Sequence, residues 1–152
     1  MLDSLDRRLL SELQKRSDST GQELAEALSL SASQVVRRRQ RLEAEGFILG
    51  YTAKLDPKKL GLGVQAFIQI QMAAHNTDAA QSFAKLVATM REVTGCWTLT
   101  GAADYLMRVW CSDLSALNEL IQNRLLPHPV VARVESKIVM EQLKQDSGLP
   151  ML

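Results

Sequence analysis

The sequence predicts an α+β protein of two domains, a helical one followed by one built around a sheet. Up to about residue 50, apolar residues recur at the spacing of amphipathic helices, as at Leu2, Leu5, Leu9 and Leu13. Beyond Gly61-Leu62-Gly63 the pattern alternates, as in a strand with one buried face. The length of 152 residues allows two small domains. We place them at residues 1–50 and 64–152, joined by a linker over 51–63.

The composition is that of a folded globular protein, with 46% hydrophobic and 23% charged residues. The net charge is only +1, so the distribution of charge must indicate any nucleic-acid partner. No apolar run approaches the roughly 18 residues that span a bilayer, and the N-terminus lacks a signal-peptide pattern. Two cysteines are too few for a disulfide framework. These features predict a soluble, cytoplasmic protein with no membrane partner.

The first domain is predicted to contain three short helices. The first covers about residues 3–16. The second begins at a capping box formed by Thr20 and Glu23, and the third at the pair Ser31 and Gln34. The third helix ends at Gly46, a residue type suited to a left-handed C-terminal cap. Only two residues separate the second and third helices, as in a helix-turn-helix, whose second helix can enter the major groove of DNA.

Basic residues concentrate in the third helix, in the run Arg37-Arg38-Arg39-Gln40-Arg41. Val35 and Leu42 should face inward, which places arginines together on another face. Such a run is more often a solvated charged face, but two capped helices joined by a tight turn favour DNA binding. Arginine can hold guanine or phosphate, and glutamine can read adenine with both amide atoms. The expected DNA-binding residues are Ser31, Ser33, Gln34, Arg37, Arg38 and Arg41.

The second domain is predicted to have the order βαββαβ. A strand over 64–72 is followed by a helix from about 77 to 90, and strands over 95–101 and 104–111 are joined by a two-residue turn. A helix then runs to about residue 125, and a last strand covers 130–140. This is the ferredoxin-like pattern. The second face of the first strand carries Gln65, Phe67, Gln69 and Gln71, which suits an interface or a solvated face about equally.

The chain resembles the leucine-responsive/asparagine-operon (Lrp/AsnC) family of transcription regulators over nearly its whole length. The resemblance in the first domain rests on Leu2-Asp-x-x-Asp6-x-x-Leu-Leu-x-x-Leu13, Leu24-Ala-x-x-Leu28 and Arg37-Arg38-x-x-Arg41-Leu42-Glu43-x-x-Gly46-x-Ile48-x-Gly50-Tyr51. It continues through Leu55-Asp-Pro-x-x-Leu-Gly61 and Leu99-Thr-Gly-x-x-Asp-Tyr-Leu106. Arg39 departs from the family, which usually has an aliphatic residue there. We expect its guanidinium to lie along the helix or to meet Glu43.

The resemblance implies a winged-type helix-turn-helix followed by a ferredoxin-like α/β sandwich. It implies binding of double-stranded DNA and of a small-molecule effector, an amino acid or a related metabolite, between subunits. It also implies a homodimer formed through the sheet, with dimers assembling to an octamer. The expected effector-binding residues surround the turn between the two middle strands, with one more on the last strand: Thr100, Gly101, Ala102, Ala103, Asp104, Tyr105 and Ser136.

Other functions find little support in the residues. His75 and His128 are the only histidines, and neither has the spacing of a metal site or a catalytic triad. We expect no catalytic residues, no metal and no cofactor, hence no enzyme. The alternative function is an effector-independent protein that organises DNA, since it would share all the helix-turn-helix features.

Overall fold

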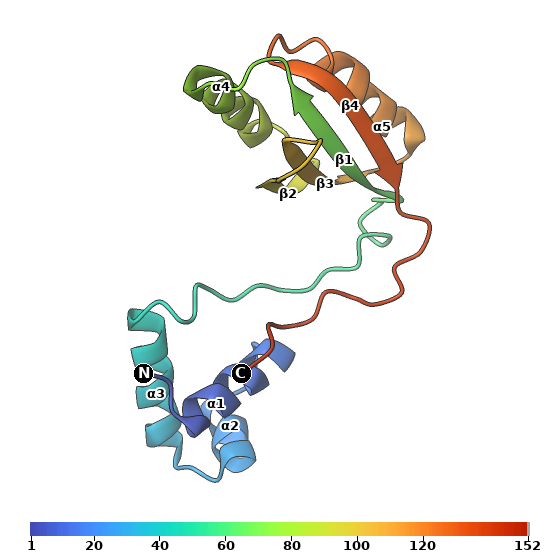
Figure 1. Cartoon of the computed structure of the whole chain (residues 1–152). Coiled ribbons are helices and arrows are strands. Elements are labelled where there is room, and N and C mark those ends of the chain that lie inside the picture. Colours follow the sequence, from blue (N-terminus) through green and yellow to red (C-terminus); the bar gives the residue numbers. More distant parts are fainter. Residues whose placement is uncertain (152) are drawn as a thin grey trace. The chain divides into compact units, whose positions relative to one another are not determined.

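The computed structural model describes residues 1–151 and divides the chain into two units (Figure 1). The first contains Met1–Lys54 and the C-terminal segment from Lys144, and the second contains Leu55–Leu143. The residues from Lys144 onward thus group with the helical unit, although the predicted second domain, 64–152, includes them. The physical reason is a reciprocal amide contact: Gln14 Nε2 donates to the carbonyl of Leu149, whose N–H donates to Gln14 Oε1.

The first unit contains three capped helices, α1 (Ser4–Lys15), α2 (Gly21–Leu28) and α3 (Ala32–Ala44). Each starts with a capping box, in which two residues three apart exchange hydrogen bonds between side chain and backbone. The boxes at Thr20 and Ser31 confirm the prediction. A third box, between Asp3 and Asp6, starts α1.

The helices pack around one apolar cluster, and a tight turn sets the angle between α2 and α3. Ser29 adopts a left-handed conformation (φ 56°), and the N–H of Leu30 donates to the carbonyl of Ala25. Gly46 has φ +75°, which favours glycine at this position. The cluster consists of Leu9, Leu10, Leu13, Leu24, Ala25, Leu28, Val35 and Leu42.

No strand follows α3 within residues 45–63 of the described chain, so the wing of the predicted winged-type domain is not a β-hairpin here. A strand needs a neighbour to which its backbone can hydrogen-bond, whereas the N–H groups of Leu60 and Leu62 donate within a local turn, to the carbonyls of Asp56 and Pro57. Leu149 and Met151 instead join residues 47–54 and the end of α1 around an open depression of about 820 Å³.

The second unit has the predicted order, β1 (Val64–Met72), α4 (Thr77–Ala88), β2 (Val93–Thr98), β3 (Tyr105–Cys111), α5 (Leu114–Glu119) and β4 (Val131–Ile138). A π-helical turn over Leu120–Leu125 extends α5. The strands lie in the order β2-β3-β1-β4, with every neighbouring pair antiparallel. This arrangement confirms the ferredoxin-like fold.

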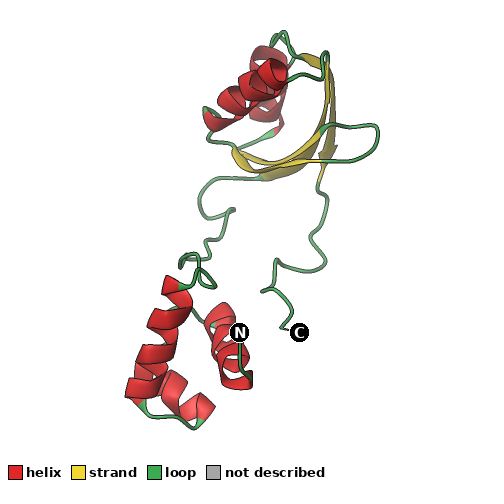
Figure 2. Cartoon of the chain, turned by 60° about the vertical axis from the view of Figure 1, so that its left-hand side comes forward, coloured by secondary structure: helices red, strands yellow, loops and turns green. Residues whose placement is uncertain are grey.

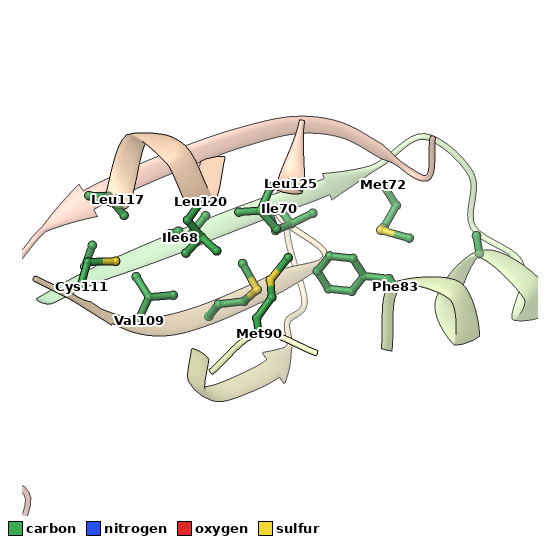
Figure 3. Packing of buried hydrophobic residues seen from close by; sticks show 13 residues of the cluster. Ile68, Ile70, Met72, Phe83, Met90, Val109, Cys111, Leu117, Leu120 and Leu125 are labelled. Carbon is green, nitrogen blue, oxygen red and sulfur yellow. The ribbon is translucent and has the colours of Figure 1, made fainter. Parts of the chain in front are cut away.

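Both helical segments of the second unit lie on the same side of the sheet (Figure 2). Alternate residues of β1 and β3, such as Ile68 and Val109, pack with Phe83 of α4 and with Leu117, Leu120 and Leu125 (Figure 3). The other side, which we call the open face, carries the intervening residues. These are Gln65, Phe67, Gln69 and Gln71 of β1, Trp97 of β2, Leu106, Arg108 and Trp110 of β3, and Arg133, Glu135 and Lys137 of β4.

The connection between β2 and β3 differs from the predicted two-residue turn. A two-residue turn at 102–103 would place Trp97 opposite Arg108, but Trp97 pairs with Leu106, so the register is shifted by two residues. The N–H of Leu99 donates to the carbonyl of Asp104, which closes a longer loop over 100–103. The N–H of Asp104 donates to the carbonyl of Ile70, which ties the loop to β1. Within residues 1–151, no helix is both long and apolar enough to cross a bilayer.

Candidate nucleic-acid interface and sheet-face groove

Three of the expected DNA-binding residues lie together in the first turn of α3. Ser31 is the N-cap, and its hydroxyl accepts from the N–H of Gln34 at 3.2 Å. The hydroxyls of Ser31 and Ser33 lie 3.0 Å apart. Ser31, Ser33 and Gln34 are all exposed. The capping box thus holds this polar group at the surface, at the end of the helix where a recognition helix meets bases.

The side-chain amide of Gln34 has only one of its two polar atoms unoccupied. Gln34 Oε1 accepts from the N–H of Ser31 at 3.0 Å and from its hydroxyl at 3.2 Å. Reading adenine with two hydrogen bonds would require both the oxygen and the nitrogen of this amide. The interpretation of Gln34 as a two-atom adenine reader is therefore wrong for this conformation, because the helix cap already uses the oxygen.

The three expected arginines do not form one group of unoccupied cations. Arg37 is exposed and has no ion-pair partner within the described residues. Arg38 Nη1 lies 2.7 Å from Asp6 Oδ1 and 2.6 Å from Asp3 Oδ2. Arg41 Nη2 lies 2.6 Å from Asp6 Oδ1. Two of the arginines thus bind α1 to α3, and the sequence-based expectation of a common free face is corrected.

Asp6 is the centre of this ion-pair cluster and is fully buried. Burial would raise the pKa of its carboxyl group, but hydrogen bonds from Arg41, from the N–H of Asp3 and from Arg38 outweigh that effect. They lower the pKa from 3.8 to about 2. The carboxylate therefore stays charged over the whole physiological range, and it fixes α3 against α1.

Arg39, the position that departs from the family pattern, meets Glu43 as expected and also Tyr51. Its Nε lies 3.2 Å from Glu43 Oε1 and donates to Tyr51 Oη at 2.8 Å. The Tyr51 hydroxyl in turn donates to Glu43 at 2.7 Å. The guanidinium carbon lies 4.4 Å from the centre of the Tyr51 ring, a cation–π contact. Tyr51, which follows α3 in the chain, is thus held against that helix by Arg39 and Glu43.

A small groove of about 220 Å³ lies on the open face, beside the loop between β2 and β3. Arg133 and Glu135 contribute charges of opposite sign, and Arg133 has no ion-pair partner within the described residues. Lys137 Nζ lies 3.4 Å from Glu135 Oε1 and partly neutralises it. Gln71 Nε2 donates to the carbonyl of Ala102 at 2.6 Å and holds the loop against the groove. The groove is lined by Gln69, Ile70, Gln71, Leu99, Thr100, Ala102, Ala103, Arg133 and Glu135.

The structure brings part of the expected effector set together at this groove. Thr100, Ala102 and Ala103 line it, and Gly101 lies in the same loop with φ +112°, a conformation that favours glycine. The carboxylate of Asp104 is engaged elsewhere. It accepts from the N–H of Met72 at 2.7 Å and lies 2.9 Å from His75 Nε2.

The other two expected effector residues lie on the helix-covered side of the sheet. The ring of Tyr105 packs against that of Phe83 with centroids 4.6 Å apart. Ser136 pairs with Ile68, whose side chain is buried beneath the helices. In an antiparallel pair, opposite residues share a face, so the structure does not bring Ser136 to the groove.

Four polar lining residues were missed by sequence reasoning, namely Gln69, Gln71, Arg133 and Glu135. The signal was present as two in-phase alternations, one in the first strand and one in the last. Recognising that these strands are neighbours would have paired Gln69 with Glu135 and Gln71 with Arg133. Within residues 1–151, no three His, Cys, Asp or Glu side chains gather in a way that could hold a metal ion.

Comparison with protein-family models finds two matches that together cover most of the chain. Residues 2–48 match a winged helix-turn-helix DNA-binding family, and residues 65–149 match the Lrp/AsnC ligand-binding domain. The chain is 38% identical over 151 residues to the DNA-binding transcriptional activator DecR of Escherichia coli K12, covering 99% of both chains. It is 35% identical over 148 residues to the leucine-responsive regulatory protein of the same organism, covering 97% of this chain and 90% of the relative.

Comparison with solved structures finds proteins of the same family. A transcriptional regulator of Neisseria meningitidis, crystallised as an L-Met complex, superposes with a TM-score of 0.95 at 35% identity and covers 99% of this chain and 97% of its own. AsnC of E. coli superposes with a TM-score of 0.88 at 27% identity over 99% of both chains. The chain therefore belongs to the Lrp/AsnC family and is a DNA-binding transcription regulator, not an enzyme.

Proposed function

We propose that this regulator acts in the cytoplasm and binds double-stranded DNA as a homodimer, with α3 of each copy in a major groove. Such a dimer reads two half-sites related by its own symmetry, so the operator should be roughly palindromic. The observation that carries the proposal is the first turn of α3, where a capping box holds three exposed polar side chains one turn before the unpaired Arg37.

Arg37→Ala should weaken DNA binding and reduce its dependence on salt. A cation without a carboxylate partner displaces counterions from DNA when it contacts a phosphate. Each phosphate contact that is lost lowers the slope of log affinity against log salt concentration by about 1. The measurement is the affinity for a selected duplex by fluorescence anisotropy at several salt concentrations.

The matched control is Lys85→Ala, which removes an exposed cation from α4 in the other unit. It should leave both affinity and slope unchanged. An Arg37→Ala variant with the wild-type slope would show that Arg37 does not contact phosphate.

The open face supports a second copy of the chain as the partner of the sheet. Phe67, Leu106 and Trp110 are half-buried there, and 47% of Trp97 is exposed, so large apolar side chains alternate with glutamines. A sheet with helices on one side gains stability when its other apolar side is covered. We place the dimer contact on this face and propose that dimers assemble further, to an octamer. Sedimentation of the wild-type chain separates these assemblies from a monomer.

The groove beside the 100–103 loop suits an amino acid as the effector. Arg133 offers donors for a carboxylate, and Glu135 with the amide oxygen of Gln71 offers acceptors for an ammonium group, while the Gln69 amide oxygen already accepts from Lys137 Nζ at 3.1 Å. The L-Met complex of the N. meningitidis relative supports the same class of ligand. In this proposal Thr100, Ala102 and Ala103 form the loop side of the site, and Glu135 rather than Asp104 supplies the carboxylate that accepts from the ammonium group.

An amino-acid effector should raise the thermal midpoint of the chain, and Arg133→Ala should abolish that rise. Ligand at about 100 times its dissociation constant adds roughly 2.7 kcal/mol of stability, which corresponds to several degrees for a domain of this size. The measurement is thermal unfolding with L-methionine and each other amino acid at millimolar concentration.

Arg91→Ala, which removes an exposed arginine outside the groove, is the control and should respond as the wild type does. A rise that persists in Arg133→Ala would move the ligand away from the groove. No rise with any amino acid, together with intact DNA binding, would favour the effector-independent DNA-organising protein.

A further inference from the structure

We propose that Gln34 reads a base that offers hydrogen-bond acceptors, with guanine preferred. The proposal rests on the proposed binding of α3 in the major groove. It also rests on the orientation of one amide group, whose oxygen belongs to the helix cap and whose nitrogen does not.

The orientation of this amide follows from its partner. The group that faces the Gln34 side chain is the backbone N–H of Ser31, 3.0 Å away. A backbone N–H can only donate, so the atom facing it must be the amide oxygen. Nε2 then takes the other position, and no hydrogen bond occupies it within residues 1–151. Gln34 is exposed, so this nitrogen is available to a ligand as a donor of two hydrogen bonds.

A side chain that only donates discriminates among the four bases in the major groove. Guanine presents two neighbouring acceptors, N7 and O6, and thymine presents O4. Cytosine presents the amino group N4, which is itself a donor, and adenine presents the donor N6 beside N7. Gln34 with its oxygen in the cap therefore favours guanine, accepts thymine and disfavours cytosine. An adenine-specific contact would require Oε1 to leave the capping box and the N–H of Ser31 to lose its partner.

Gln34→Glu separates the reading role from the capping role. Glutamate is a usual residue at this position of a capping box, so the N-terminus of α3 is kept. Its carboxylate has no N–H, so the donor is lost. The experiment selects binding sites for the full-length wild type, Gln34→Glu and Gln34→Ala from a randomised duplex library. The position whose preference becomes flat in Gln34→Ala is the one that Gln34 reads.

The wild type should enrich guanine at that position by about fivefold over cytosine, the lower end for a specific base contact. Gln34→Glu should lose this preference and shift toward cytosine, whose amino group can donate to a carboxylate. The control Gln22→Glu adds the same charge on the exposed surface of α2. It should lower affinity for all duplexes alike and leave the enriched sequence unchanged. The thermal midpoint of Gln34→Glu should match that of the wild type.

Two results would overturn the inference while leaving DNA binding intact. One is a wild-type preference for adenine at the position that Gln34→Ala flattens. The other is an enriched sequence that is identical for the wild type and Gln34→Glu. Failure of the wild type to enrich any duplex would instead overturn the proposed function itself, and this inference with it.

Discussion

Replacing Asp6 with alanine should lower the free energy of unfolding of the helical unit by about 3 kcal/mol. The carboxylate is fully buried and lies within 2.7 Å of both Arg38 and Arg41. Its removal leaves two guanidiniums on α3 without their shared partner and also breaks the capping box of α1. The effect is at the lower end for a buried pair because both arginines are partly exposed and can turn to water. Chemical denaturation measures the loss, and hydrogen exchange in α1 and α3 peptides assigns it to this unit.

The matched control is Asp3→Ala, which removes a half-exposed carboxylate that lies 2.6 Å from Arg38 Nη1 and also caps α1. Asp3→Ala should lower the free energy of unfolding by clearly less than Asp6→Ala does. Equal stability of Asp6→Ala and the wild type would mean that the cluster does not hold α3 in place.

The low pKa of Asp6 gives a second measurement of the same interaction. Because the folded-state pKa is lowered from 3.8 to about 2, the stabilisation is present above about pH 4 and is lost as the pH falls toward 2. This shift in pKa corresponds to a loss of about 2 kcal/mol of stabilisation between neutral and strongly acidic pH. Asp6→Ala should lack it, so the stability difference between the wild type and the variant should narrow over this acid range.

Phe83→Ala should destabilise the sheet unit by about 4 kcal/mol. The side chain is 1% exposed, and it packs within the cluster between α4 and the sheet (Figure 3). Its ring also contacts that of Tyr105, the first residue of β3. Alanine leaves a cavity that the surrounding β-branched and methionine side chains fill only in part. The measurement is chemical denaturation, combined with hydrogen exchange in peptides from β1, β3 and α4.

Lys85→Ala, on the exposed side of the same helix, is the control and should change stability by no more than about 0.5 kcal/mol. A Phe83→Ala variant as stable as this control would contradict the packing of α4 against the sheet. A loss confined to the peptides of the helical unit would contradict the division of the chain into two units.

Arg37, Arg38 and Arg41 show what a local sequence pattern can and cannot predict. The prediction that this helix carries a basic surface held for Arg37, while Arg38 and Arg41 are paired with acids of α1 more than 30 residues away. Periodicity gives the direction of a side chain around its own helix. It does not tell which charges of another helix lie in that direction.

Local sequence patterns were sufficient to predict the three helices of the first unit, the capping boxes of α2 and α3, the tight turn between them and the βαββαβ order. These features depend on residues within about one turn or one strand of each other, so their signals are local. Tertiary contacts determine which arginines stay unpaired and which unit the C-terminal segment joins. They also determine the register of β2 and β3 and the sides on which Tyr105 and Ser136 lie. Each of these depends on atoms brought together from distant parts of the chain, whose contacts packing selects and local propensity does not encode.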